Sequence, residues 1–377
     1  MVDDNVATIK ANDQLYTAWE SVMVRRDYDT AISVFEFSAA ENAYGPDNQN
    51  LKLGPGDKVE ITLGGVKVLT GRITTRSVAF DHQSHQVVLA GRSLMQEALV
   101  SSVKVVQGNY NATTFEQATR AVLQPHGINL VMQNAPAIAS KPFKNLAVQY
   151  GETCLEFISR IAMMRGLILT DDADGNLIAG QADASAAPDA ALVQGVNILR
   201  GTGKLDDQSV VGKMAAVSQQ PGDDSNWPPR DRSATLTDSN SLYPNRLHLF
   251  VSEHPGDNED LVARVQYEKN RSNWPSVQCS FTVAGWKKAD GSLWWPAKFV
   301  SIYCPMIFPT QTGKFTLGIN SCTYSQDSQN GTTTVLEMVL PDLLTGQPTS
   351  HISDVSGVQS GAPQAAVPGV PDYQVGT

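Results

Sequence analysis

The chain has 377 residues, 41% of them hydrophobic, and its 28 basic and 38 acidic side chains give a formal net charge of −10. This length predicts two to four domains with buried cores, and an acidic chain without a dense run of Lys and Arg is not expected to bind DNA or RNA specifically. The sequence shows no secretory signal after its acidic start and no apolar run of about 18 residues, so we expect a protein made in the cytosol.

Residues 1 to 100 read almost throughout as strands. Residues 22 to 26 alternate between apolar and other side chains at the two-residue period of a strand, and residues 34 to 37 begin another. A hairpin follows between residues 57 and 92, and it turns at Gly64-Gly65 because two glycines can both adopt the positive φ of a tight turn.

Residues 101 to 190 change to mixed helix and strand and are predicted to form an α+β insert. Two helices are expected to begin at capping boxes, one at Thr113 with Glu116 and one at Thr153 with Glu156. The short strands expected around the helices cover residues 128–132, 146–149, 167–170 and 177–179, and the last two are joined at Asp174-Gly175.

Residues 191 to 344 return to strands, with one helix and one long loop inserted. The strands are expected at residues 210–217, 247–251 and 277–283, the helix at 258–271, and the exposed loop at 220–241. Trp286, Trp294 and Trp295 are expected to cluster around the turn at Asp290-Gly291. Residues 345 to 377 are rich in small residues and Pro, so this tail is predicted to be flexible unless a partner orders it.

One strand pattern occurs twice, far apart in the chain. Residues 59–73 read strand, turn, strand, and are followed by another strand at 85–89. Residues 299–303 and 313–319 repeat the arrangement, again followed by a strand at 333–339. A chain that carries one small β-module twice can build a quasi-symmetric object, so the repeat favours assembly over chemistry.

No metal or disulfide pattern stands out. Cys154, Cys279, Cys304 and Cys322 lack paired ligand spacing, and we expect four reduced and mostly buried thiols. His82 and His85 have the spacing of two metal ligands but lack a third nearby, so a solvated turn is favoured. The Asp-rich run at 171–176 fails the register of a calcium-binding loop and is better explained as the hairpin turn.

The sequence also lacks the motifs of the common catalytic sites. Glu152 and Glu156 could be paired carboxylates, but a capping role explains them better. The run Gly201 to Lys204 is only a fragment of a phosphate-binding loop, and Glu253-His254 is a weak pair. Trp294-Trp295 in a strand is more typical of a pair that is half core and half interface than of a sugar platform. We therefore predict no enzyme activity and no catalytic, cofactor-binding or metal-binding residues.

Three stretches carry a resemblance to a known family. Residues 56–73, with Asp81 and the closing residues 89–93, resemble the N-terminal barrel of phage baseplate hub proteins. Residues 143–177 resemble the middle of the same family, as does the run Glu253 to Gly256. In order and spacing the pattern is similar to the hub of Mu-like contractile-tailed bacteriophages over most of residues 1 to 345, with related folds in late-control tail proteins and at the base of type VI secretion spikes.

The resemblance implies a mainly β fold with two tail-tube-like β-barrels per chain and a small α+β domain. The barrels would be residues 1–100 and 191–344, the α+β domain 101–190, and the flexible tail 345–377. It further implies a homotrimer in the virion tail baseplate, assembled in the host cytoplasm, that joins the sixfold tail tube to the threefold membrane-piercing spike. Its expected partners are the tail tube protein, the central spike protein and baseplate wedge proteins, while DNA passes through the acidic channel without specific binding.

Two alternatives remain open. Tyr150 to Thr153, followed by a helix that ends near Arg165-Gly166, is similar to the opening of a LysM module, so a tail protein that binds or cleaves peptidoglycan is the principal alternative. The second helix of such a module is missing, because a hairpin follows directly. A type VI spike protein is the other alternative, and it would need a long C-terminal β-helix for which the sequence shows no pattern.

Overall fold

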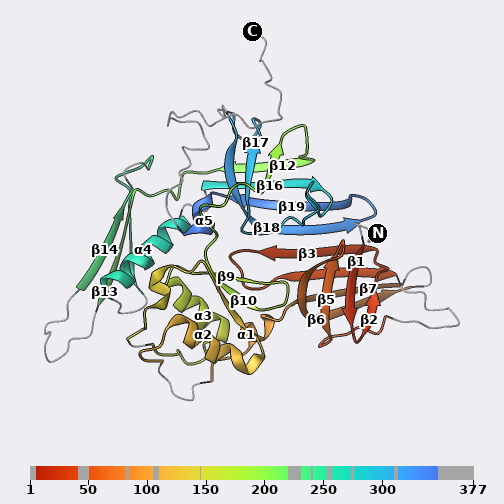
Figure 1. Ribbon diagram of the computed structural model, residues 1–377, viewed down its shortest axis with the longest axis horizontal. Coiled ribbons are helices and arrows are strands. Elements are labelled where there is room, and N and C mark those ends of the chain that lie inside the picture. Colours follow the sequence, from red (N-terminus) through yellow and green to blue (C-terminus); the bar gives the residue numbers. More distant parts are fainter. Residues whose placement is uncertain are drawn as a thin grey trace, which may run out of the picture.

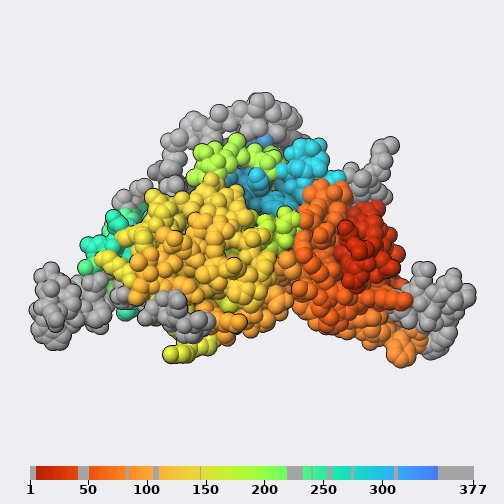
Figure 2. Space-filling model, turned by 60° about the horizontal axis from the view of Figure 1, so that its bottom comes forward, coloured from red at the N-terminus to blue at the C-terminus, as the bar shows by residue number. Residues whose placement is uncertain are grey.

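The computed structural model describes residues 6–40, 51–81, 85–104, 110–144, 146–219, 231–238, 241–252, 257–272, 276–309 and 313–346. Within these ranges the fold is mainly β with a small α+β part, as predicted. Figure 1 shows a first β-unit in red and orange, a second in blue, and the α+β insert in yellow beside the first unit, and the space-filling view in Figure 2 shows the insert and the first unit next to each other on one face. No helix in the described part of the chain has the length and apolar character needed to cross a membrane.

The first β-unit is a run of antiparallel strands in which neighbours in space are mostly neighbours in sequence. The order across the sheet is β3 (Ser21–Asp27), β4 (Val34–Ala40), β7 (His85–Ser93), β6 (Val66–Phe80), β5 (Lys58–Leu63), β1 (Ala7–Ala11) and β2 (Gln14–Tyr16). The turn between β5 and β6 is the predicted one, with both Gly64 and Gly65 at positive φ. The predicted hairpin is therefore confirmed.

The second β-unit repeats this order. Its strands run β12 (Arg200–Leu205), β16 (Val277–Ala284), β19 (Gly331–Val339), β18 (Phe315–Asp327), β17 (Phe299–Tyr303) and β11 (Ala190–Val193). β6 and β18 each contain a bulge at the same place in the unit, after Ile73 and after Ile319. Each unit is followed by a short helix, α1 (Gln96–Val100) or α5 (Pro341–Thr345). One difference is that β1 pairs antiparallel with β5, whereas β11 pairs parallel with β17.

The two units are not closed barrels, and the expectation of two complete barrels is wrong in this respect. The second half of β18 pairs with β3 of the first unit, so all these strands form one 13-stranded sheet. A single apolar core runs through both units, from Ile9 and Phe37 to Phe281 and Ile302. The physical reason is that the long strand β18 exceeds its partner β17, and its surplus backbone groups find their hydrogen bonds on the neighbouring unit.

The α+β insert has its own core and a three-stranded sheet in the order β8, β10, β9. Its elements are α2 (Phe115–Leu123), η1 (Gln124–His126), β8 (Leu130–Gln133), η2 (Ala137–Ser140), α3 (Cys154–Met163), β9 (Ile168–Asp171) and β10 (Leu177–Gly180). The capping box of α3 at Thr153 and Glu156 is confirmed. That of α2 is one residue later than predicted, at Thr114 and Gln117. Residues 146–149 form no named strand, contrary to the prediction.

A further sheet is inserted in the sequence between β12 and β16 of the second unit, which are themselves paired. It consists of β14 (Asp231–Thr237), β13 (Lys213–Gln219) and β15 (Leu247–Val251), with α4 (Asn258–Ser272) packed against it. β14 falls where a long loop was predicted. Ser233, Thr235 and Thr237 are exposed, and Ala234 and Leu236 pack toward Leu261 and Val265 of α4. The alternation is weak because few of its residues are apolar, which is why the sequence pattern did not indicate a strand.

Several remaining predictions can be placed. All four cysteines are buried and none is in a disulfide, and burial raises the pKa of Cys279 to about 12. Trp286 and Trp294 lie in the shared core with Trp295 against it, as expected. His82, residues 220–230, the run Glu253 to Gly256, and the tail from residue 347 lie outside the described residues.

Candidate functional site

The first candidate site is the seam between the two β-units, where β18 of the second unit pairs with β3 of the first. β3 and β18 pair antiparallel, with Val24 opposite Tyr324 and Arg25 opposite Thr323. Tyr324 is fully buried and its hydroxyl donates to the carbonyl of Trp294. On the opposite face, Arg25 donates to Asp27 at 3.0 Å and to Glu337 of β19 at 2.9 Å. The seam is therefore a continuation of the sheet with specific side-chain contacts on both faces.

A buried arginine lies where the two β-units and the insert meet. Arg26 in β3 donates to the backbone oxygen of Asp171 at 2.6 Å, to its carboxylate at 3.3 Å, and to the carbonyl of Val68 in β6. Its guanidinium lies 4.5 Å from the ring of Trp295, which belongs to the second unit. One side chain thus contacts the first unit, the second unit and the end of β9 in the insert.

Asp171 completes this contact. Its carboxylate accepts from the backbone N–H of Ser33 at 3.0 Å and from the Ser33 hydroxyl at 2.6 Å, and none of its side chain is exposed. A buried charge costs several kcal/mol unless it is paired and hydrogen-bonded, and here both ions have multiple partners. The pair therefore fixes how the insert sits on the two β-units. The sequence pattern indicates Arg26 only as part of an alternating strand, although its charge falls in the buried phase of that strand, on the same face as Val22 and Val24.

A second joint connects the insert to α4. Lys141 donates to Asp257 at 2.6 Å and to Glu259 at 2.8 Å, and Arg165 donates to Asp260 at 2.7 Å. The Arg165 guanidinium lies 3.9 Å from the ring of Phe143, and burial lowers its pKa from the usual value while Asp260 opposes that shift. This joint ties the insert to the sheet that interrupts the second β-unit.

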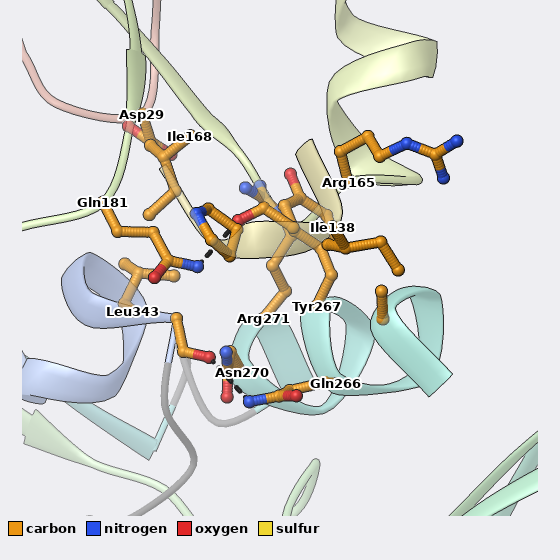
Figure 3. Close-up of a pocket in the computed structure, with 14 residues that line it drawn as sticks. Asp29, Ile138, Arg165, Ile168, Gln181, Gln266, Tyr267, Asn270, Arg271 and Leu343 are labelled. Carbon is orange, nitrogen blue, oxygen red and sulfur yellow. Dashed lines mark hydrogen bonds between the residues drawn. The ribbon is translucent and has the colours of Figure 1, made fainter. Parts of the chain in front are cut away.

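A cavity of about 190 Å³ lies beside that joint, where the insert, α4 and α5 meet the loop after β3 (Figure 3). Gln181 donates to the carbonyl of Gly166 at 2.9 Å, and Gln266 donates to that of Gly346 at 3.1 Å. Burial raises the pKa of the Asp29 carboxyl on one wall, and Arg271 opposes this shift. Among the described residues that line the cavity there is no His, Cys or Ser, so the lining offers a packing joint rather than a nucleophile with a base.

Glu152, Glu156 and the run Gly201 to Lys204, which were considered for chemistry, have structural roles. Glu152 is buried and paired with Arg160 at 2.7 Å, and Glu156 accepts from the Thr153 backbone at 2.8 Å, so they do not face each other across a cleft. The fragment from Gly201 to Lys204 lies in strand β12, which is the wrong geometry for a phosphate loop. In the part of the chain that the structure describes, no three metal-ligating side chains come together.

Comparisons with known proteins agree on one group. Residues 6–93 match the family described as "Mu phage baseplate assembly protein GpP-like, N-terminal", and residues 97–181 match "Baseplate hub protein gp44-like, second domain". The chain is 28% identical over 304 residues to baseplate hub protein gp44 of Escherichia phage Mu, which covers 79% of each chain. The resemblance to Mu-like baseplate hub proteins is thereby confirmed.

Solved structures show the same fold. A 43 kDa tail protein of prophage MuSo2 from Shewanella oneidensis has a TM-score of 0.76 at 24% identity, covering 90% of this chain and 100% of that one. A tail protein from Neisseria meningitidis has a TM-score of 0.75 at 20% identity, covering 92% and 99%. A type VI secretion component of Escherichia coli is more distant, with a TM-score of 0.53 at 13% identity, covering 88% and 76%.

Proposed function

We propose that this chain is a structural baseplate hub of a contractile phage tail, and that three copies form an adaptor between the sixfold tail tube and the threefold membrane-piercing spike. A role as a phage baseplate hub or tail protein is supported by the relative in phage Mu and by both matching domain families. The trimer and its place between tube and spike are the finer part of the proposal.

The repeated β-unit is the observation that carries the proposal. Both units have the same strand order and the same bulge, and the β3–β18 seam places them side by side in one sheet. Three chains would therefore present six similar units to a sixfold tube while keeping threefold symmetry for a spike. A heterologous contact that closes after three copies gives a ring rather than a filament.

The mass of the purified protein tests this directly. Light scattering at micromolar concentration is expected to give three times the chain mass, and averaged electron micrographs are expected to show a ring with a central hole and six similar lobes. A chain that stays monomeric, alone and when mixed with its tube and spike proteins, would contradict the proposed adaptor.

We extend the proposal to location, domains and activity. The hub would lie in the virion tail baseplate after assembly in the host cytoplasm, with the domain division at residues 100, 190 and 344 and with wedge proteins as further partners. The net charge of −10 suits a channel that DNA passes without specific binding. An enzyme activity is not part of the proposal, because the relatives are structural hub proteins and Glu152 and Glu156 are engaged in local contacts.

The peptidoglycan alternative has less support. α3 is followed directly by the strand β9, so the helix pair of a LysM module is not formed here. Incubation with purified peptidoglycan would decide between them: we expect the protein to stay in the supernatant without releasing murein fragments, and retention like that of a known binder would favour the alternative.

A further inference from the structure

We infer that β12 of one copy pairs antiparallel with the second half of β6 of the next copy, in a register that the internal repeat defines. This inference rests on the proposed trimer. It names the strands and the residue pairs that would join the subunits, and it follows from the seam that already exists inside each chain.

The repeat aligns the two units residue by residue. The bulges make Thr75 in β6 equivalent to Ser321 in β18, because each is the first paired residue after the irregularity. Pairing across the sheet then makes Met23 in β3 equivalent to Thr202 in β12, through the registers of the intervening strands. By this alignment the ion pair of Arg25 with Asp27 corresponds to that of Lys204 with Asp206.

That correspondence is an independent check on the alignment. Arg25 lies 2.8 Å from Asp27, and Lys204 lies 2.6 Å from Asp206, at the same strand end in each unit. The two pairs were not used to derive the alignment, which came from backbone pairing alone. Their agreement indicates that β3 and β12 occupy the same place in their units.

The repeat defines two equivalent places at which such a seam could form, and within the described residues only one of them is paired. Ser321 to Gln326 of β18 pairs with β3. The equivalent residues of the first unit, Thr75 to Phe80, pair with β7 on one side, and among the described residues no strand lies on the other. β12 is likewise paired only with β16 within the described chain. The molecule therefore leaves one strand edge of each kind open, and the two edges are complementary.

Burial follows the same division. β3 alternates between buried and half-buried residues and β18 has no exposed residue, whereas β12 is exposed except for Leu205, and β6 is exposed over most of its second half. Val78 is 53% exposed and Phe80 77% exposed, although the residue equivalent to Val78 is the fully buried Tyr324. An open edge with exposed apolar side chains is a template for another strand.

The seam register predicts which side chains would meet. In the seam Tyr324 lies opposite Val24, so across the proposed contact Val78 would lie opposite Gly203 and Phe80 opposite Gly201. Ile307 of the same chain packs over this face of β12 beside Gly201 and Gly203, so Val78 and Phe80 would meet an apolar side chain there. An aromatic ring across from a strand glycine also compensates for the missing side chain. The same register places Ser77 opposite Lys204 on the other face.

Paired cysteines test the register. In the full-length protein, Ser77→Cys with Lys204→Cys is expected to give a disulfide-linked trimer as the main species under mild oxidation. A matched control combines Ser77→Cys with Arg200→Cys, which lies four residues out of register, roughly 13 Å along the strand, and should link poorly. Mixing the two single-cysteine chains should give linked dimers only, which establishes that the bond joins different copies.

The outcomes separate this inference from the hub proposal. A trimer by light scattering without the Ser77–Lys204 link, or with equal linking of the control pair, overturns the strand pairing and leaves the hub proposal standing. A protein that is monomeric with its partners present and does not link overturns both. Circular dichroism of each variant shows whether the substituted chains are folded before either result is read.

Discussion

The first and second β-units have the same strand order but opposite surroundings at their equivalent edges. β3 is covered by β18, whereas β12 carries no second strand within the described chain. The buried alternation of β3 and the exposure of β12 follow from that difference, since the backbone position is the same in both. Whether one of these edge strands is buried thus depends on whether another strand pairs with it, not on the unit to which it belongs.

One pair of equivalent side chains, in β3 and in β12, shows how the two units differ in their contacts with the insert. Arg26 of β3 is buried and bound to Asp171 of the insert, whereas its counterpart in β12 is the half-buried Leu205. The insert therefore docks on the first unit through a charge that the second unit lacks. Repeated units have kept their pairing pattern while their contacts with the rest of the chain have diverged.

The largest effect is expected from breaking the contact that only the first unit has. Arg26→Met leaves the Asp171 carboxylate buried without its cation, so the free energy of unfolding should fall by about 3–5 kcal/mol. Chemical denaturation measures this change. Arg25→Met is the matched control, because its side chain is 36% exposed and lies on the opposite face, and it should cost about 1 kcal/mol or less. Equal losses in the two variants would contradict the central role of Arg26.

Charge on the open edge should act on assembly instead of folding. Phe80→Asp removes a large apolar contact from the proposed subunit interface, and we expect association to weaken on the order of tenfold or more at each contact. Sedimentation at several concentrations measures the association. Leu15→Asp is the control, since Leu15 is 64% exposed on β2, away from the proposed edge. Equal weakening in both variants would contradict the prediction.

A smaller effect on stability is expected from removing a single hydrogen bond of the seam. Tyr324→Phe leaves the buried carbonyl of Trp294 without its donor, which should lower the free energy of unfolding by about 1–3 kcal/mol. Tyr16→Phe removes an exposed hydroxyl contact with Gln14 and should change stability by about 0.5 kcal/mol or less. If both substitutions prove neutral, the Tyr324 hydroxyl adds nothing to the seam.

The insert offers a local comparison with both β-units. Thr153→Ala removes the side-chain oxygen that accepts from the Glu156 backbone at 3.2 Å, and the loss of this cap should cost about 1 kcal/mol. Hydrogen exchange should show faster opening in α3 than in the strands of the seam. Thr114→Ala tests the equivalent cap of α2 and should act on that helix alone. Uniform acceleration across the whole chain would argue against an insert that opens separately.

The smallest effect is a pH dependence of the same cap. The pKa of Glu156 is lowered from its usual 4.5 because its carboxylate accepts from the Thr153 backbone. A depressed folded-state pKa means that the contribution is present above pH 4.5 and is lost as the pH falls through the folded value. Glu156→Gln can keep the cap without titrating, so its stability should lack this loss. Identical pH profiles for both proteins would rule the contribution out.

Local sequence determined much of the secondary structure. Gly64-Gly65 predicted the β5–β6 turn, Thr153 with Glu156 predicted the start of α3, and the doubled strand pattern predicted a doubled unit. These features depend on residues a few positions apart, whose conformational preferences act wherever the segment lies. Local signals also explain the error at α2, where Thr113 and Thr114 stand side by side and both have a suitable partner three residues on.

Only the tertiary structure decided how the units are joined. The sequence pattern fits a closed barrel as well as an open sheet, and the choice was made when the surplus length of β18 met β3, about 300 residues away in the chain. The partnership of Arg26 with Asp171 is equally invisible in either segment alone, because each charge is acceptable in the interior only when the other is present. Strand pairing and buried charge depend on contacts between distant segments, and no local pattern specifies which segments will meet.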